Sequence, residues 1–310
     1  MIDIKIETAR QLIIREEYFK RLVKWIDVKG MWIKTGNATT NKMMRFIRNN
    51  VRDYFLAPAD KMKTRSDDFT NQFSKEKKQY EGVSRTNKPT TSYGLFIKRM
   101  RDIYNEFMQE ENVTHEKNGY WLMKELNIKV CPYCNRNYTI TIHTKNVKVR
   151  PEFDHFYPEA IHPSLILSFY NLVPSCPQCN HLKRTQELEM NPWIGYSKEK
   201  RPTFRVDTSI EDFPANPKLK IVGENANTKK LGIKELYGEH TDYVKDILNK
   251  IQAYNPATYR AIIKDFQGIV NTMSGLERMV WGNYTNQADA SNRPLAKLTA
   301  DILEQYKKYL

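Results

Sequence analysis

The sequence predicts a mostly helical α+β protein with a small zinc-bearing β region at its centre. Three observations predict it. Both flanks carry apolar residues at helical spacing, the stretch 138–154 begins with alternating β-branched residues, and all four cysteines lie in two Cys-Pro-x-Cys pairs that bracket residues 135–175. We therefore expect a basic helical region over residues 1–128, a core over 129–192 and a mainly helical region over 193–310.

Composition limits the class of protein. The chain has 310 residues, 40% of them hydrophobic, enough for one large or two modest domains. No apolar run approaches the ~20 residues needed to cross a bilayer, and the first residues lack a secretion-signal pattern, so we expect a cytoplasmic protein without membrane contact. The formal net charge is +14, and residues 1–130 hold 26 basic against 17 acidic side chains. This excess favours nucleic acid as partner, although an acidic protein surface would also fit.

The N-terminal flank is predicted to form a series of amphipathic helices. Apolar residues recur at helical spacing over residues 8–28, 42–56 and 95–108, and a short helix is expected over 120–126. Between residues 60 and 92 the hydrophobic residues thin out and Lys, Ser, Thr, Asp and Asn dominate. This stretch is predicted to be a surface loop, and it is a candidate for a mobile lid.

The central and C-terminal parts mix strands and helices. Residues 138–143 and 147–154 predict a β-hairpin that turns at Lys145 and Asn146, and Pro151 predicts an edge or a bend in its second strand. A helix is expected to grow out of Cys179 and to extend over residues 179–189. Short strands are expected over 201–207 and 218–222, followed by helical stretches over 227–254, 256–280 and 293–309. No Walker motif, dinucleotide loop or internal repeat is present.

The cysteine spacing predicts a structural zinc site. Each pair, Cys131 with Cys134 and Cys176 with Cys179, is separated by two residues, so each short turn can direct both sulfurs at one ion. A redox pair would need only one such motif. Disulfides are the competing explanation, and they are disfavoured in a cytoplasmic protein.

Around these pairs the chain resembles the HNH endonucleases. Asp154 and His155 with Pro158, then Asn171 shortly before Cys176, then Asn180 and Lys183 after Cys179, follow in the order of that motif over residues 131–185. The resemblance implies a ββα-metal core of the treble-clef type and metal-dependent hydrolysis of phosphodiesters. The segment before the second cysteine pair also resembles HNH proteins of bacterial anti-phage systems, notably the Septu type and retron-associated effectors, which implies an ATPase as protein partner.

The chemistry suggests a role for each motif residue. A histidine of near-neutral pKa can take a proton from the attacking water, and we assign this role to His155. Mg²⁺ or Mn²⁺ prefers oxygen ligands, supplied by Asp154 and, by the resemblance, by the amide of Asn180, with His181 in reserve. Adjacent strand residues point to opposite faces, so a regular strand cannot direct both Asp154 and His155 at one site. The resemblance places His155 where the strand ends and Asp154 just before it, which leaves irregular backbone to bring both to the metal.

Three further residues receive supporting roles with open alternatives. Asn171 is expected to fasten the loop that carries His155, although it would also suit a turn cap. Lys183 and Arg184 are candidates for holding a substrate phosphate, or are ordinary solvated charges. DNA is the favoured substrate and RNA the second. The alternative function is a non-catalytic zinc adaptor that binds nucleic acid or protein.

Overall fold

The structure of the protein is a computed structural model, which describes residues 1–32, 35–111, 115–197, 200–208, 217–254, 256–266, 270 and 272–309. Within these ranges the chain is mostly helical with small antiparallel sheets, in agreement with the predicted class. No helix in the described ranges combines the length and the apolar character needed to span a bilayer.

The N-terminal helices largely follow the predicted ranges. Helices α1 (Thr8–Val28), α6 (Ser92–Gln109) and α7 (Asn118–Leu126) confirm three of them. The single helix expected over 42–56 is instead two, α2 (Ala38–Asn49) and α3 (Val51–Phe55). They separate at Asn50, whose side-chain amide donates a 2.8 Å hydrogen bond to the Phe46 carbonyl and so competes with the helical backbone.

The loop expected over residues 60–92 is wrong, because most of this stretch is helical. It forms α4 (Met62–Gln72) and α5 (Ser74–Gly82). Met62, Phe69 and Phe73 are buried, and their spacing of seven and four residues places them on one helix face. The Phe69 ring lies 4.9 Å from that of Phe73 and 4.8 Å from that of Phe96 on α6, between centroids. A few large aromatic rings therefore anchor a segment that is otherwise polar.

This packing gives a direct test. Phe69→Ala should destabilise the protein by about 3–5 kcal/mol, because it empties a fully buried ring site. Asn71→Ala, at an exposed position of the same helix, should leave the free energy of unfolding within about 0.5 kcal/mol. Urea unfolding followed by circular dichroism measures both, and equal midpoints for the two variants would mean that α4 is not part of the folded core.

The central region forms two sheets where one hairpin was expected. Strands β1 (Ile142–His143) and β2 (Lys148–Val149) pair with each other, and the chain then bends at Pro151. Strand β3 (Glu152–His155) pairs instead with β4 (Leu172–Ser175), so the predicted second strand is divided in two. Proline has no N–H to donate to a ladder, which accounts for the break. Helix α8 (Pro177–Lys183) follows β4 and is shorter than the expected one.

The C-terminal part confirms the two predicted strands and subdivides the helices. Strands β5 (Thr203–Val206) and β6 (Leu219–Val222) pair antiparallel. The stretch 227–254 is broken at Gly232, which has the left-handed φ of 57°. The helices of this part are α9 (Ala226–Lys230), α10 (Ile233–Gly238), α11 (Thr241–Ala253), α12 (Pro256–Phe266), α13 (Met273–Trp281) and α14 (Ala296–Gln305).

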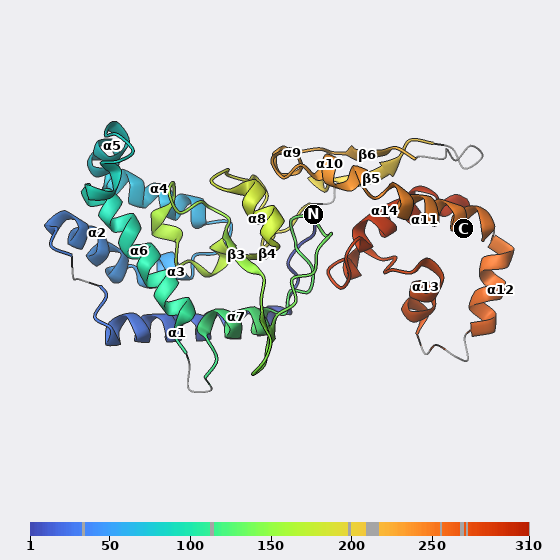
Figure 1. Cartoon of the computed structure of the whole chain (residues 1–310), viewed down its shortest axis with the longest axis horizontal. Helices are drawn as coiled ribbons and strands as arrows, with labels where there is room; N and C mark the ends of the chain where they lie inside the picture. The colour runs from blue at the N-terminus through green and yellow to red at the C-terminus, as the bar shows by residue number, and fades with distance from the viewer. Residues whose placement is uncertain are drawn as a thin grey trace.

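Strands β3 and β4 lie between two hydrophobic cores. Phe153 and Leu172 join the core of the N-terminal helices, whereas Val173 joins the core that contains the four cysteines and the C-terminal helices. Figure 1 shows β3, β4 and α8 in the middle of the molecule, with α1–α6 on one side and α11–α14 on the other. The alternation of side chains along each strand sends successive residues into different cores.

Candidate active site and metal centre

The four cysteines form a buried cluster that could hold a metal ion. Their sulfur atoms all lie within 4.8 Å of one another, and the Sγ atoms of Cys134 and Cys176 are 3.9 Å apart. A tetrahedral site with Zn–S bonds of about 2.3 Å has sulfur–sulfur separations of about 3.8 Å, so the spacing fits zinc. No disulfide joins the four cysteines.

The surroundings of the cluster suit a cation. Burial raises the pKa of the Cys131 thiol, so the thiolate form needs a compensating positive charge. The side-chain amide of Asn137 and the backbone N–H of Arg136 each donate to a cysteine sulfur, Cys176 and Cys134 respectively, at 3.3 Å. N–H donors of this kind stabilise thiolate ligands, and zinc is the ion that best matches an all-thiolate tetrahedron.

Strand β3 presents the predicted catalytic pair on opposite faces. Asp154 faces the first cysteine pair, where its carboxylate accepts a 2.5 Å hydrogen bond from the Tyr133 hydroxyl. His155 faces the N-terminal helices, where its ring meets that of Tyr104 edge-on at 4.7 Å between centroids. The strand ladder remains regular through His155, which pairs with Leu172. The irregular backbone expected at this point is therefore absent, and the two groups address different sides of the strand.

Asp154 is engaged in a buried ion pair with Lys183. The Lys183 ammonium donates to Asp154 Oδ1 at 3.0 Å and to the His155 carbonyl at 2.7 Å. The side chains are 0% and 3% exposed. The expectation that Lys183 holds a substrate phosphate is therefore wrong in this structure, because the ammonium is fully enclosed and bonded to the protein. Arg184 is exposed and bonded to the His181 carbonyl, and His181 is exposed beside it.

Asn180 lies against Glu152, two residues before Asp154. Its side-chain amide donates a 2.7 Å hydrogen bond to Glu152 Oε2, and among the described contacts none joins it to Asp154. Because side chains two apart on a strand share a face, Glu152 and Asp154 present two carboxylates on the side that carries Asn180. These are hard oxygen donors of the type that Mg²⁺ prefers. Glu152 was not among the predicted site residues. Its position two residues before Asp154 on a strand was a sequence signal that could have identified it.

Both nitrogens of the His155 imidazole face oxygen acceptors. Nε2 lies 3.0 Å from the Ile166 carbonyl, which can only accept, so Nε2 carries the proton. Nδ1 lies 3.1 Å from Glu159 Oε1. Burial lowers the pKa of His155, and the nearby carboxylates of Glu159 and Asp154 partly offset this effect. A lowered pKa favours the neutral ring, in which Nδ1 has a lone pair that can accept a proton. Only the protonated ring donates from Nδ1 to the Glu159 carboxylate.

Asn171 clamps the turn that follows His155. Its side-chain oxygen accepts the Tyr157 N–H at 2.7 Å, and its amide donates to the carbonyls of Tyr157 at 3.1 Å and Leu165 at 3.0 Å. The backbone carbonyl of Asn171 also accepts from Phe156 N. Asn171 is completely buried. The residue thus fixes the backbone of the turn that directly follows the strand residue carrying the imidazole.

A second histidine ties this turn to the N-terminal helices. His162 lies 2.7 Å from Ser66 Oγ on α4 through Nδ1, and 2.8 Å from Glu187 Oε1 through Nε2. Ser66 is 1% and His162 2% exposed, so these two members are closed to a substrate and brace the fold, whereas the Glu187 side chain at the other end is 40% exposed. Its members are separated in sequence by 96 and 25 residues, a distance over which no local pattern could join them.

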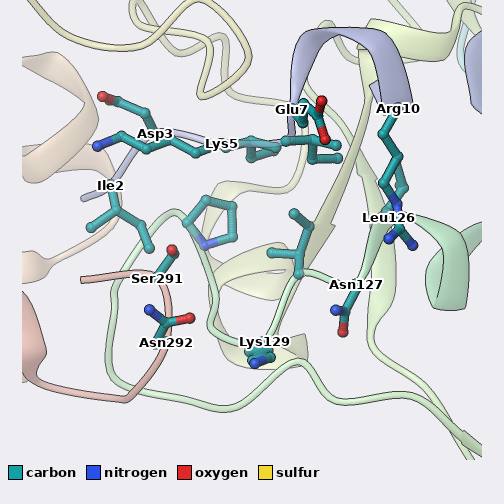
Figure 2. Close-up of a pocket in the computed structure, with 14 residues that line it drawn as sticks. Ile2, Asp3, Lys5, Glu7, Arg10, Leu126, Asn127, Lys129, Ser291 and Asn292 are labelled. Atoms are coloured by element: carbon teal, nitrogen blue, oxygen red, sulfur yellow. The ribbon is translucent and has the colours of Figure 1, made fainter. Parts of the chain in front are cut away.

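A separate pocket of about 330 Å³ lies beside the N-terminal segment. Figure 2 shows Asp3, Lys5 and Glu7 along one side of it, with Asn127 and Lys129 across from them. The pocket lining, all of it from described residues, includes none of the candidate site residues. Charged residues of both signs line it. We assign it no part in the chemistry of His155.

Comparison with known proteins places one relative beside this chain. No protein-family model matches, and no solved structure matches. Over 113 residues the chain is 28% identical to a protein named Septu protein PtuB from Bacillus thuringiensis. The matched stretch covers 36% of this chain and 40% of that protein. The chain is therefore distantly similar, over about a third of its length, to a Septu protein.

Proposed function

We propose that this protein is a metal-dependent endonuclease of the HNH type, with a treble-clef core formed by the cysteine pairs, β3, β4 and α8. The observation that carries the proposal is the setting of His155. A buried imidazole at the end of β3 has its Nε2–H directed to the Ile166 carbonyl, and the turn that follows the strand is clamped by Asn171. A module that only binds nucleic acid or protein has no need to orient a histidine in this way.

The proposed mechanism assigns the proton to a defined atom. With Nε2 protonated, Nδ1 of His155 takes the proton of the water that attacks phosphorus. Lys183 and Tyr133 hold the Asp154 carboxylate in place. Each carboxylate oxygen retains a lone pair beyond these hydrogen bonds. Glu152, Asp154 and Asn180 lie on the other face of β3 from His155 and would hold Mg²⁺ or Mn²⁺ there. The ion would neutralise charge on the phosphate and its leaving oxygen, and the proposal therefore requires the end of β3 to rearrange when substrate binds, so that the ion and His155 meet at one phosphate.

The net charge and the similarity to a Septu protein support a substrate class and a biological setting. A net charge of +14 suits the nucleic-acid backbone, with DNA favoured over RNA. The site would contact phosphates rather than base edges, so it carries no sequence preference of its own. Similarity to a Septu protein supports a role as the nuclease of a bacterial anti-phage system. We infer an ATPase partner in that system.

The test is cleavage of plasmid DNA and total RNA by the purified protein with Mg²⁺ or Mn²⁺. His155→Ala should lower the rate by roughly 10²–10⁴-fold, the usual contribution of a general base. His115→Ala is the matched control, because that side chain is 91% exposed and outside the site, and it should cut like the wild type. If neither wild type nor variant cuts any substrate, alone or with a co-purifying ATPase, while zinc stays bound, the adaptor function is the better account.

A further inference from the structure

Arg101 on α6 lies outside the HNH-like segment, yet it reaches the candidate base through one carboxylate. Its Nε donates to Glu159 Oε2 at 2.6 Å, and Oε1 of the same carboxylate lies 3.1 Å from Nδ1 of His155. Nδ1 is the nitrogen left for chemistry, because Nε2 is bonded to the Ile166 carbonyl. A single acidic group therefore stands between an arginine and the nitrogen that would accept the proton.

The guanidinium of Arg101 is accessible and has donors to spare. The side chain is 45% exposed, compared with 23% for Glu159 and 9% for His155. Among the described residues its two terminal amino groups have no hydrogen-bond partner. A planar fork of N–H donors matches two oxygens of a phosphate as well as those of a carboxylate. Arg101 can thus exchange one anion for the other.

The cations predicted for this role are placed differently. Lys183 is enclosed with Asp154, on the other face of β3. Arg184 donates to the His181 carbonyl at the end of α8 and has no described contact with His155 or Glu159. Arg101 is the exposed cation that the described contacts connect to the His155 imidazole.

We propose that Arg101 binds a backbone phosphate of the nucleic-acid substrate beside His155, and that Glu159 occupies the guanidinium until the phosphate replaces it. The inference rests on the proposed nuclease function for the identity of the substrate. Carboxylate and phosphate compete for the same donors, so the exchange would free Nδ1 of His155 as the phosphate arrives. The N-terminal helices would then supply part of the active site.

Binding can be measured apart from cleavage. Fluorescence anisotropy of a short labelled DNA duplex, and of the matching RNA, is recorded over a salt series in buffer without added divalent metal, with the probe checked for intactness on a gel. Arg101→Ala should weaken binding about tenfold or more, the usual effect of losing a hydrogen bond to a charged group. It should also lower the slope of log K against log salt by about one. Glu159→Gln should tighten binding, and this gain should vanish in the double variant.

The Lys98–Asp102 pair is the matched control, because it is an exposed ion pair of 3.5 Å on the same helix. The effects of Lys98→Ala and Asp102→Asn on the affinity for the probe should be additive in the double variant, without the coupling expected between Arg101 and Glu159. The inference is overturned if Arg101→Ala leaves the salt slope unchanged or if no probe binds. It is also overturned if the double-mutant cycle of Arg101 with Glu159 shows the same coupling in binding as the cycle of Lys98 with Asp102. Wild type that binds through Arg101 yet never cleaves with Mg²⁺ or Mn²⁺, alone or with a co-purifying ATPase, would refute the nuclease function instead.

Discussion

Removal of zinc is expected to unfold the half of the protein that contains the cysteines. Structural zinc sites contribute about 10–16 kcal/mol of apparent binding free energy, as much as the whole stability of a typical domain. All four cysteines lie inside the second core. The backbone of the first pair is also bonded outward, since the Tyr237 hydroxyl donates to the Cys134 carbonyl at 2.5 Å and Leu295 N donates to the Asn135 carbonyl at 2.7 Å. Loss of the ion should therefore reach α10 and α14.

The measurement combines metal content with unfolding. The wild type should contain one zinc per chain, and its four thiols should react with a thiol reagent only after a zinc chelator is added. Cys176→Ser should lose the metal and the cooperative thermal transition. Ser175→Ala is the control next to it: its buried hydroxyl has no hydrogen-bond partner among the described residues, so its loss should be neutral. A zinc-free protein with an unchanged transition would contradict the prediction.

Breaking the Lys183–Asp154 pair should have the largest effect of any single charge removal near the site. Lys183→Met leaves the Asp154 carboxylate buried without its counter-charge, which costs about 3–5 kcal/mol of folding free energy. Arg184→Met removes the same charge one residue later at an exposed position and should change stability by about 0.5 kcal/mol or less. Denaturant unfolding of both variants gives the comparison.

A double variant separates the ion pair from simple loss of packing. Asp154→Asn removes the stranded charge, so Asp154→Asn with Lys183→Met should recover a large part of the lost stability. If Lys183→Met unfolds at the same denaturant concentration as Arg184→Met, the ammonium is not buried as described. If the double variant is no more stable than Lys183→Met alone, the loss comes from packing around the lysine stem.

The features that could be predicted from the sequence were local ones. The features that could not be predicted depend on contacts between segments that are distant in the sequence. The cysteine pairs and α1 were recoverable because spacing along the chain sets their geometry. The 60–92 stretch was misjudged because a count of apolar residues does not register how much area two phenylalanines bury. The burial of Lys183 depends on a carboxylate 29 residues earlier, and a lysine that faces solvent would have the same local sequence.

The arrangement of β3 shows the same limit at the candidate site. The motif named Asp154 and His155 together, and strand alternation alone would have separated them, as the structure does. Glu159 was within reach of a sequence argument, four residues after His155, but Arg101 is 58 residues from Glu159 and no pattern connects them. Residues contributed by a different helix are the part of a site that a motif leaves out.

The position of β3 and β4 between two cores has a consequence for how the motif can be moved or inherited. A segment cut out at residues 129 and 192 would expose Phe153 and Leu172 on one side and Val173 with the cysteines on the other. Its two hydrophobic surfaces would lack their covering helices, so the segment is not expected to fold as an independent domain. Because β3 and β4 pack against both cores, substitutions in the helices of either flank are tolerated only where they preserve the packing against these strands.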